Sequence, residues 1–400
     1  MPLTATEQRL CENITAHAGV LLEDLRRHVA IPTGLGNTPG LDETRKLLTT
    51  RLAALGASVL LVPGEPKAAW LYGSDPIGPI PPTAICRCQA RGRAVLLGGH
   101  LDTVHDPKSS FRELTIAPDG KTATGPGCVD MKGGLVIAVA ALEALAAVGI
   151  DASWGFILNS DEETGSYHSD TALRTEASNR DMAYVAGFVL EPAMPDGGLV
   201  VERPGSGQFM IEAHGRSAHV GRDFTAGVSA VTALAKCVVR VSELPDPSRG
   251  LIANIGPLEG GPATNVVPDR GRAWGNVRFP TPQLGEELGH ALESMATPAN
   301  ALPGVSVVRS FNRPAKPLTP ATDALARQAR RAAEDLGQKL PFGKTGGVCD
   351  GNNLQAAGLP TIDTLGVRGG GLHTHGEWIE LASLVERCQL LAVLISRLCS

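Results

Sequence analysis

Short apolar runs alternate with helical patterns over the first half of the chain. Three of these runs, Ala94–Leu97, Trp154–Asn159 and Tyr184–Leu190, are short and continuous, as expected of strands buried on both faces. Residues 135–148 lie between the first two runs and hold a single acid, which predicts a helix buried against a sheet. The alternation predicts an α/β fold in which helices flank a mostly parallel sheet.

The amino-terminal segment carries further helical patterns. Apolar residues recur at helical spacing over residues 4–29 and predict one amphipathic helix. A second helix is expected over Asp42–Leu55, and a strand is expected over Ser58–Val62. Residues 63–92 are rich in proline and glycine, which indicates irregular structure at the edge of the sheet.

A different order of elements begins near residue 203. Strands are expected at residues 207–214, 251–258, 272–279 and 305–311, with helices at 226–244 and 283–296. This βαββαβ order is that of a split-βαβ sandwich, so residues 203–314 are expected to form an inserted α+β domain. The earlier alternation resumes with a helix at 322–336, a loop at 346–353, a strand at 360–365 and a helix at 379–398. The larger domain is therefore expected to comprise residues 1–202 and 315–400.

Composition and charge narrow the class of protein. The chain of 400 residues exceeds what one compact core accommodates, which agrees with two domains. A formal net charge of −5 and the lack of a basic run argue against a nucleic-acid partner. No uncharged apolar run is long enough to span a membrane, and the first residues lack the apolar core of a signal peptide. The eight scattered cysteines fit reduced thiols, so we expect a soluble, cytoplasmic protein without a membrane partner.

Acidic residues and histidines fall just beyond the predicted strands or in glycine-rich loops. They are His100, Asp102, Asp130, Glu162, Glu163, Glu191, His373 and His375. Because ligands of an open α/β sheet bind at the carboxyl ends of its strands, we expect most of these side chains to meet at one edge. That many carboxylates repel one another unless a divalent cation, or a pair of cations, lies between them. Carboxylate and imidazole ligands together suit Zn²⁺, Co²⁺ or Mn²⁺, and Asp130 has room to bridge two ions.

Each of these residues also has an ordinary structural explanation. Glu162 and Glu163 would stabilise a helix N-terminus through its dipole. Glu191, which precedes a proline, would be a solvated strand end. His375 offers an imidazole nearly as well placed as that of His373, although the four-residue step to the next glutamate favours His373.

Several short motifs follow one another along the chain. They are His100-x-Asp102, Gly125-x-Gly127-x-x-Asp130-Met131-Lys132-Gly133-Gly134, Asp161-Glu162-Glu163-x-Gly165, Glu191-Pro192, Gly215-Arg216-Ser217-Ala218-His219, Asn265-Val266-Val267-Pro268 and Gly369-Gly370-Gly371-Leu372-His373-x-x-x-Glu377. In order and spacing, these motifs resemble the M20 family of co-catalytic zinc peptidases, most closely its glutamate carboxypeptidase branch. The resemblance extends from about residue 10 to the end of the chain. It implies a dinuclear metallohydrolase whose inserted domain is a lid and dimerisation domain.

The resemblance implies a ligand set for two divalent metal ions, with Zn²⁺ expected and Co²⁺ or Mn²⁺ as alternatives. One ion would be held by His100, Asp130 and Glu191. The other would be held by Asp130, Glu163 and His373. The carboxylate of Asp130 would therefore be shared by both ions.

The resemblance also implies roles for residues that bind no metal. Glu162 would be the general base that activates the attacking water, and Asp102 would orient the histidine ligand beside it. His219 would steady the tetrahedral oxyanion in the active site of a partner subunit. Arg278, with its planar guanidinium, would bind the terminal carboxylate of the substrate with help from Asn265.

Two positions depart from the family pattern, since relatives tend to carry a serine where Cys349 stands and an acid where Asn276 stands. The details of the substrate pocket are therefore open. The combined prediction is hydrolysis of an amide bond next to a free carboxylate by a homodimer that acts on a small peptide or an N-acyl amino acid.

Three functions are compatible with this chemistry. The first is a carboxypeptidase that releases a C-terminal amino acid such as glutamate. The alternative is an N-acyl-amino-acid deacylase similar to acetylornithine deacetylase. A third hypothesis, from another class, is a catalytically inactive relative that binds a metal or another ligand. The presence of every proposed ligand and of the proposed base argues against the third hypothesis.

Overall fold

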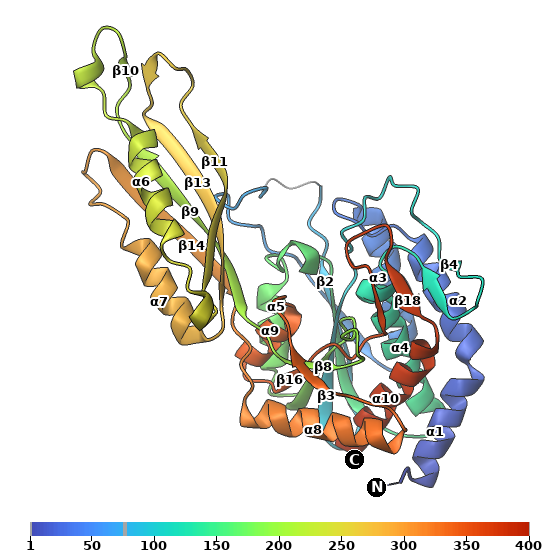
Figure 1. Ribbon diagram of the computed structural model, residues 1–400. Coiled ribbons are helices and arrows are strands. Elements are labelled where there is room, and N and C mark those ends of the chain that lie inside the picture. The colour runs from blue at the N-terminus through green and yellow to red at the C-terminus, as the bar shows by residue number, and fades with distance from the viewer. Residues whose placement is uncertain (1, 75–77, 400) are drawn as a thin grey trace.

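Two units are visible in the computed structural model, which describes residues 2–74 and 78–399 (Figure 1). The larger unit surrounds a central sheet and contains both ends of the chain. The smaller, elongated unit is formed by the elements from β9 to β14, including α6 and α7, and projects away from the larger one.

Six strands form the central sheet, in the order β1-β2-β6-β3-β7-β16. β3 lies inside it and runs parallel to β6 and β7, and β16 continues the parallel side beyond β7. β1 and β2 extend the other side with antiparallel pairing. The bounds are Ser58–Val62 for β1, Thr83–Cys88 for β2, Ala94–His100 for β3, Ser153–Asn159 for β6, Tyr184–Val189 for β7 and Thr361–Ile362 for β16. The fold is α/β as predicted, with a mixed sheet.

Helices cover both faces of this sheet because its central strands are apolar on both faces. Val95 and Leu97 of β3 join the largest core, whereas Leu96 between them joins the core on the opposite face. The helices of the first face are α1 (Ala5–Ala16), α2 (Ala18–Ala30), α3 (Thr38–Ala54), α4 (Gly133–Ala147), α8 (Pro320–Asp335) and α10 (Ala382–Cys399). α5 (Asp170–Ala177) and α9 (Asp350–Ala356) cover the second face. Among the described residues, no helix is both long and apolar enough to cross a membrane.

The smaller unit contains an antiparallel four-stranded sheet in the order β11-β13-β9-β14. Its strands are β9 (Gly205–His214), β11 (Ile252–Gly260), β13 (Arg270–Phe279) and β14 (Gly304–Arg313). α6 (Ala230–Ser242) and α7 (Pro282–Glu293) pack on one face around Phe209, Leu234 and Leu288. β10 (Ala218–His219) lies at the far tip of the unit and pairs with β12 (Val266–Val267) (Figure 1). The unit therefore has a core of its own, and its elements follow the expected βαββαβ order.

The chain crosses between the two units twice, and the crossings are tied together. Arg203 and Lys316 bridge each other through backbone hydrogen bonds in both directions. Both side chains reach Asp363, with 2.7 Å from Arg203 Nη2 to Asp363 Oδ1 and 3.2 Å from Lys316 Nζ to Asp363 Oδ2. All three residues are buried, so the cluster anchors both crossings to the larger unit.

Short strands beside the central sheet bring distant loops together. β4 (Thr115–Ile116), β5 (Thr122–Thr124), β17 (Gly369–Gly370) and β18 (Trp378–Glu380) form one small sheet, and β8 (Leu199–Glu202) pairs with β15 (Phe342–Lys344) in another. Thr124, at the end of β5, pairs with Trp378, at the start of β18. Because Glu377 immediately precedes Trp378, this pairing brings Glu377 beside the glycine-rich loop that follows β5.

Two predictions for the first hundred residues are wrong. The single helix expected over residues 4–29 is two helices, α1 and α2, which meet at His17, although apolar residues on both sides of the break are buried against the same core. The irregular stretch expected over residues 63–92 contains β2, which lies between β1 and β6. Ala84, Ile85 and Cys86 are buried there, but prolines and glycines before this short run obscure it in the sequence.

Two predictions near the end of the chain also need correction. α9 begins at Asp350, inside the loop expected over residues 346–353. Its polar residues Asp350, Asn352 and Asn353 are buried and hydrogen-bonded, so no apolar period marks this helix. The last helix starts later than expected, because Ile379 lies in β18.

His28 in α2 generates a prediction about stability. Its side chain is buried, and its Nδ1 has no hydrogen-bond partner among the described residues. Burial, together with the charge of Lys132, lowers the pKa of His28 to about 4. The unfolded chain takes up this proton near pH 6.5, so stability should fall as the pH decreases from 6.5 towards 4, by up to about 1.4 kcal/mol per pH unit.

Urea unfolding of the His28→Leu variant at several pH values between 7 and 4.5 tests this expectation. Between pH 7 and 4.5, the free energy of unfolding of the variant should decrease by about 2 to 3 kcal/mol less than that of the wild type. His17→Leu, which replaces an exposed histidine at the start of the same helix, is the matched control and should keep the wild-type slope. Equal slopes for wild type and His28→Leu would contradict the assignment.

Candidate metal centre

The carboxyl ends of three parallel strands open at one edge of the central sheet, and charged side chains follow each of them. His100 is the last residue of β3, Glu162 and Glu163 follow β6, and Glu191 follows β7. The parallel pairing brings these ends together, as is usual for ligand sites in α/β sheets. Asp130 reaches the same place from the glycine-rich loop before α4.

Two overlapping groups of ligand atoms form there, and Asp130 belongs to both. The first group consists of His100, Asp130 and Glu191, and the second consists of Asp130, Glu163 and His373. Within each group the ligand atoms lie within 4.8 Å of one another. His100 Nε2 lies 3.2 Å from Asp130 Oδ1 and 4.0 Å from Glu191 Oε1. His373 Nε2 lies 3.5 Å from Asp130 Oδ2 and 3.4 Å from Glu163 Oε2. Ligands about 2.0 to 2.2 Å from a tetrahedral ion are themselves about 3.3 to 3.6 Å apart, so most of these spacings suit a cation.

The surroundings of Glu191 also fit a cation. Its Oε1 is buried and has no hydrogen-bond partner among the described residues. A buried carboxylate oxygen without a partner is unfavourable, and a bound metal ion would satisfy it. Carboxylate oxygens with imidazole nitrogens are also a donor set that Zn²⁺ and its neighbours accept.

The pKa values of the cluster show the same excess of negative charge. Burial raises the pKa of Glu191 and that of Glu163. Burial lowers the pKa of His100, but its carboxylate neighbours outweigh this and hold the pKa well above its usual value. The pKa of His373 is raised to about 10, mainly by the carboxylate of Asp130. A bound divalent cation would replace the protons that these pKa shifts favour.

Asp102 supports the cluster from behind. Its carboxylate accepts hydrogen bonds from the backbone N–H groups of Glu162 and Glu163, at 3.2 and 3.0 Å. His100 Nδ1 lies 2.9 Å from the carbonyl oxygen of Asp102 and 3.5 Å from its Oδ1. The backbone carbonyl is thus the nearer partner of the imidazole, while the carboxylate holds the segment that carries the two glutamates.

Glu162 lies in neither group of ligand atoms and is held from the smaller unit. Arg313, the last residue of β14, donates from Nη2 to Glu162 Oε1 at 2.7 Å, and its Nη1 donates to Asp350 Oδ1 at 2.8 Å. Burial raises the pKa of Glu162 to about 8, although the charge of Arg313 opposes this shift. Sequence reasoning missed Arg313, because a single arginine at a strand end carries no motif.

Glu377 supports Asp130 and was noticed in the sequence only as part of a motif. Its buried carboxylate accepts hydrogen bonds from the backbone N–H groups of Gly127, Val129 and Asp130, at 2.8, 2.9 and 3.0 Å. His105 Nε2 lies 2.6 Å from its Oε2. The loop that carries Asp130 is therefore fixed by the carboxylate of a residue that lies 247 positions later in the sequence.

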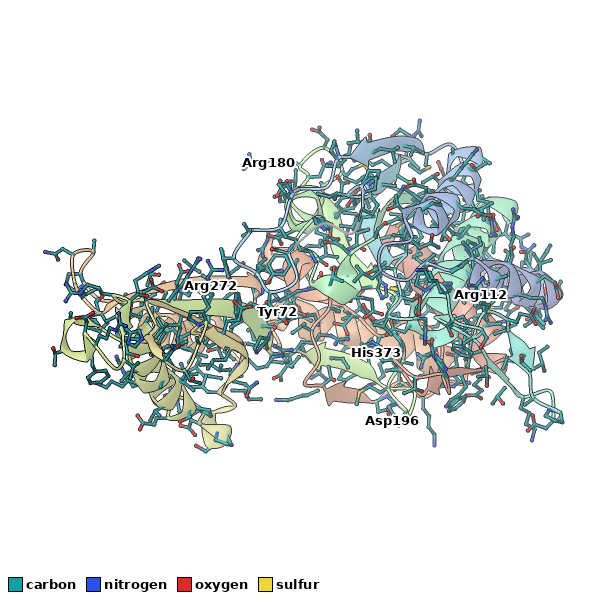
Figure 2. The ribbon with its side chains drawn as sticks, turned by 90° about the horizontal axis from the view of Figure 1, so that it is seen from above. Tyr72, Arg112, Arg180, Asp196, Arg272 and His373 are labelled. Carbon is teal, nitrogen blue, oxygen red and sulfur yellow. The ribbon has the colours of Figure 1, made fainter. Side chains whose placement is uncertain are left out.

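The two candidate histidines of the last glycine-rich motif occupy different surroundings. His373 is exposed and lies near the middle of the molecule in Figure 2, with its Nε2 beside two carboxylates. His375 instead stacks on Phe111, with ring centroids 5.2 Å apart, and lies 6.5 Å from the ring of His105. The structure thus brings His373, rather than His375, to the metal-ligand cluster.

The candidates in the smaller unit fall into two places. His219 lies in β10, and Asn265 precedes β12, so both are at the exposed tip far from the cluster (Figure 1). Arg278 lies near the junction instead, where its Nη1 donates to Ser206 Oγ at 2.5 Å. The pairings of Ser206 with Arg278 and with Arg313 put both arginines in one row across three strands.

That row leads from Arg278 towards Glu162. Directly paired residues share a face, and Val277 and Phe279 point into the core beneath the helices, so Arg278 lies on the opposite face, which the helices do not cover. Adjacent strands are about 4.8 Å apart, which puts the backbone of Arg278 about 10 Å from that of Arg313. The side chain of Asn276 also contacts the Arg278 guanidinium, and no described carboxylate forms an ion pair with Arg278.

The fold and the cluster define a metal-dependent hydrolase, in which an α/β sheet presents carboxylate and imidazole ligands at the ends of parallel strands. The chain belongs to Peptidase family M20/M25/M40, whose family model matches residues 96–397. Members of this family are metal-dependent, and the two overlapping ligand groups are the candidate binding residues here.

Relatives and solved structures agree with this assignment. The chain is 27% identical to carboxypeptidase G2 of Pseudomonas sp. (strain RS-16), over 96% of this chain and 91% of that protein. It is 29% identical to succinyl-diaminopimelate desuccinylase of Methylorubrum extorquens (strain PA1), over 87% and 91%. The fold is similar to that of aminopeptidase PepT from Bacillus cereus, with a TM-score of 0.71 and 22% identity over 96% and 99% of the two chains. It is also similar to an M20 family metallo-carboxypeptidase from Sulfolobus solfataricus, with a TM-score of 0.70 and 15% identity over 94% and 98%.

The contacts of Glu377 predict that it controls metal affinity through Asp130. Glu377→Gln keeps the size of the side chain but replaces one acceptor oxygen with an NH₂ group, which cannot accept the N–H groups that now bind there. We expect metal affinity to fall about 10- to 100-fold, as for other residues that orient metal ligands. Titration with Zn²⁺ in competition with a chelating dye measures this change.

Glu380→Gln is the matched control, because Glu380 lies three residues later in β18 and pairs with Arg368 near the surface. This variant should bind metal as the wild type does. Wild-type affinity in Glu377→Gln would show that the loop keeps its shape without the carboxylate and would contradict the prediction.

Proposed function

We propose that this protein is a dinuclear metal-dependent hydrolase that cleaves an amide bond next to a free carboxylate and releases a C-terminal amino acid such as glutamate. The observation that carries the proposal is the sharing of Asp130 between two ligand groups, one through Oδ1 and the other through Oδ2. Zn²⁺ suits these ligands best, with Co²⁺ or Mn²⁺ as alternatives. The similarity to carboxypeptidase G2 over nearly the whole chain supports this choice of reaction.

The proposed mechanism assigns the proton transfers to Glu162. Two bound divalent cations would polarise the scissile carbonyl and make water acidic enough to attack at neutral pH. Glu162 would accept the proton of the attacking water and then deliver it to the leaving amine. Burial raises the pKa of Glu162, which suits a group that both accepts and releases a proton, and Arg313 holds one oxygen of the carboxylate in place.

Arg278 is the proposed binding group for the terminal carboxylate of the substrate. It lies on the face of the smaller unit's sheet that the helices do not cover, in the same row as Arg313, which holds the proposed base. Its neighbour Asn276 is neutral, so the charge of the guanidinium is available for a substrate carboxylate. An acid at position 276 would compete for that charge.

His219 and Asn265 enter the proposal through a homodimer. Both lie at the tip of the smaller unit, too far along it to serve the cluster of their own chain (Figure 1). We infer that an edge strand or a helix of this unit, residues 203–314, forms the dimer contact. His219 of the partner subunit would then donate a hydrogen bond to the oxyanion, while Asn265 of the partner subunit would assist in binding the carboxylate.

An N-acyl-amino-acid deacylase is the second candidate, because it uses the same chemistry on a different acyl group. The similarity to a succinyl-diaminopimelate desuccinylase supports it. A catalytically inactive binding protein is disfavoured, since both ligand groups and the proposed base are present.

Replacing Glu162 separates an enzyme from a binding protein. Glu162→Gln should reduce kcat by about 10²- to 10⁴-fold, because the amide cannot carry the proton, while the metal content stays at that of the wild type. Elemental analysis of the purified protein and steady-state hydrolysis are the measurements. The adjacent Glu163→Gln is the matched comparison, and it should lose metal as well as activity. Full activity in Glu162→Gln would exclude this residue as the base.

A matched pair of substrates separates the two candidate reactions. Benzoyl-glycyl-glutamate and N-acetyl-glutamate release the same amine, so the ratio of their kcat/KM values reports only on the acyl half. A carboxypeptidase should hydrolyse the first compound faster, and a deacylase the second. If the Zn²⁺-loaded and Co²⁺-loaded protein releases no amino acid from these compounds or from the corresponding aspartate, lysine and leucine derivatives, the proposed function is wrong.

A further inference from the structure

A cavity of about 280 Å³ lies directly beside the candidate metal centre. Asp102 and Glu163 form part of its wall, and its other side is largely apolar, with Leu35, Leu41 and Ile80 among the lining residues. It lies on the Glu163 side of the cluster. A group bound next to the second ligand set would therefore extend into this cavity.

A second cavity of about 220 Å³ adjoins the first, because Leu35, Lys67, Thr164 and His168 line both. It extends to Gln208 of the smaller unit.

The loop that carries Lys67 is held against the smaller unit. Trp274 Nε1 of β13 donates to the carbonyl oxygen of Trp70 at 2.7 Å, and the rings of Tyr72 and Trp274 meet edge to face with centroids 5.5 Å apart. Figure 2 shows Tyr72 at the junction of the two units. The two neighbouring cavities therefore lie between the ligand cluster and the sheet of the smaller unit, with Lys67 in the wall of both.

Lys67 is the cation at the point where the cavities meet. Its Nζ lies 3.5 Å from the carbonyl oxygen of Thr164 and 5.9 Å from the centre of the Tyr167 ring. No carboxylate of the described residues forms an ion pair with it. Asp102 and Asp161, the carboxylates that influence it, accept hydrogen bonds from backbone N–H groups instead. The half-buried ammonium group thus has unused hydrogen-bonding capacity in a cavity.

A simpler role for Lys67 would be to balance the negative charge of the ligand cluster. Burial lowers the pKa of Lys67, and the charges of Asp161 and Asp102 only partly offset this. Two bound divalent cations would bring four positive charges to the three ligand carboxylates, which leaves Asp102 and Asp161 as the acidic groups that act on Lys67, and both already accept hydrogen bonds from backbone N–H groups. An anion from the substrate would then be the expected partner of Lys67.

We propose that Lys67 binds a carboxylate on the acyl half of the substrate, so that the preferred substrate is anionic at both ends. This inference rests on the proposed function. The amino acid that is released would present its carboxylate to Arg278, and the acyl group or penultimate residue would present a second carboxylate to Lys67. The apolar wall near Leu41 and Ile80 would contact the short chain between the amide and that second carboxylate.

Two compounds test this selectivity in the wild-type protein loaded with Zn²⁺. One is the N-glutaryl derivative of the amino acid that is released fastest in the substrate panel, and the other is its terminal amide, which has the same shape without the charge. The kcat/KM value should be about 10- to 100-fold higher for the glutaryl compound, as expected of a charge-assisted hydrogen bond. A ratio near or below one would overturn the proposal.

Variants then assign the preference to Lys67. Lys67→Met should reduce the ratio to about one by raising KM for the glutaryl compound, while the values for the terminal amide and the metal content stay unchanged. Lys67→Arg should restore part of the preference. Lys121→Met, which replaces an exposed lysine beside β5, is the control and should keep the wild-type ratio. An undiminished preference in Lys67→Met would overturn the assignment to Lys67.

The outcomes also separate this inference from the proposed function. Hydrolysis of both compounds at similar rates leaves the hydrolase intact and removes only the role of Lys67. Failure to hydrolyse any member of the panel removes the proposed function, and the role of Lys67 falls with it.

Discussion

Repulsion among buried carboxylates is the constraint on which the rest of the site depends. Asp130, Glu163 and Glu191 approach one another at the edge of the sheet, with two imidazoles between them. Each carboxylate pays a desolvation cost that only an opposite charge can offset, and Glu191 Oε1 has no other partner among the described residues. Divalent cations bound at the two ligand groups would offset this cost.

The carboxylates of Asp102 and Glu377 hold the candidate metal ligands at fixed positions. Asp102 and Glu377 both act through backbone N–H groups: Asp102 holds Glu162 and Glu163, and Glu377 holds the loop of Asp130. Binding the backbone rather than a side chain fixes the whole segment, so the ligand that it carries has little freedom to move. Two of the segments that carry candidate metal ligands are thus anchored by residues distant in sequence.

The smaller unit takes part in the site instead of merely covering it. Arg313 reaches the carboxylate of Glu162 from the end of β14, and the junction beside it is fixed by the buried contacts of Arg203 and Lys316 with Asp363. Trp274 ties the opposite part of the same sheet to the loop that carries Lys67. The position of the smaller unit therefore sets both the proposed base and the cavity on the acyl side.

The sequence by itself determined the elements whose patterns are local. The apolar runs before His100, Glu162 and Glu191 predict buried parallel strands, and the parallel arrangement alone implies that these residues meet. The sequence did not reveal β2, the break at His17 or α9, because their apolar period is short, interrupted or replaced by buried polar residues. Only the tertiary structure decided between His373 and His375, and only it brought Arg313, Glu377 and Lys67 to the site. These residues act through contacts over long sequence separations, and such contacts leave no periodic pattern in the chain.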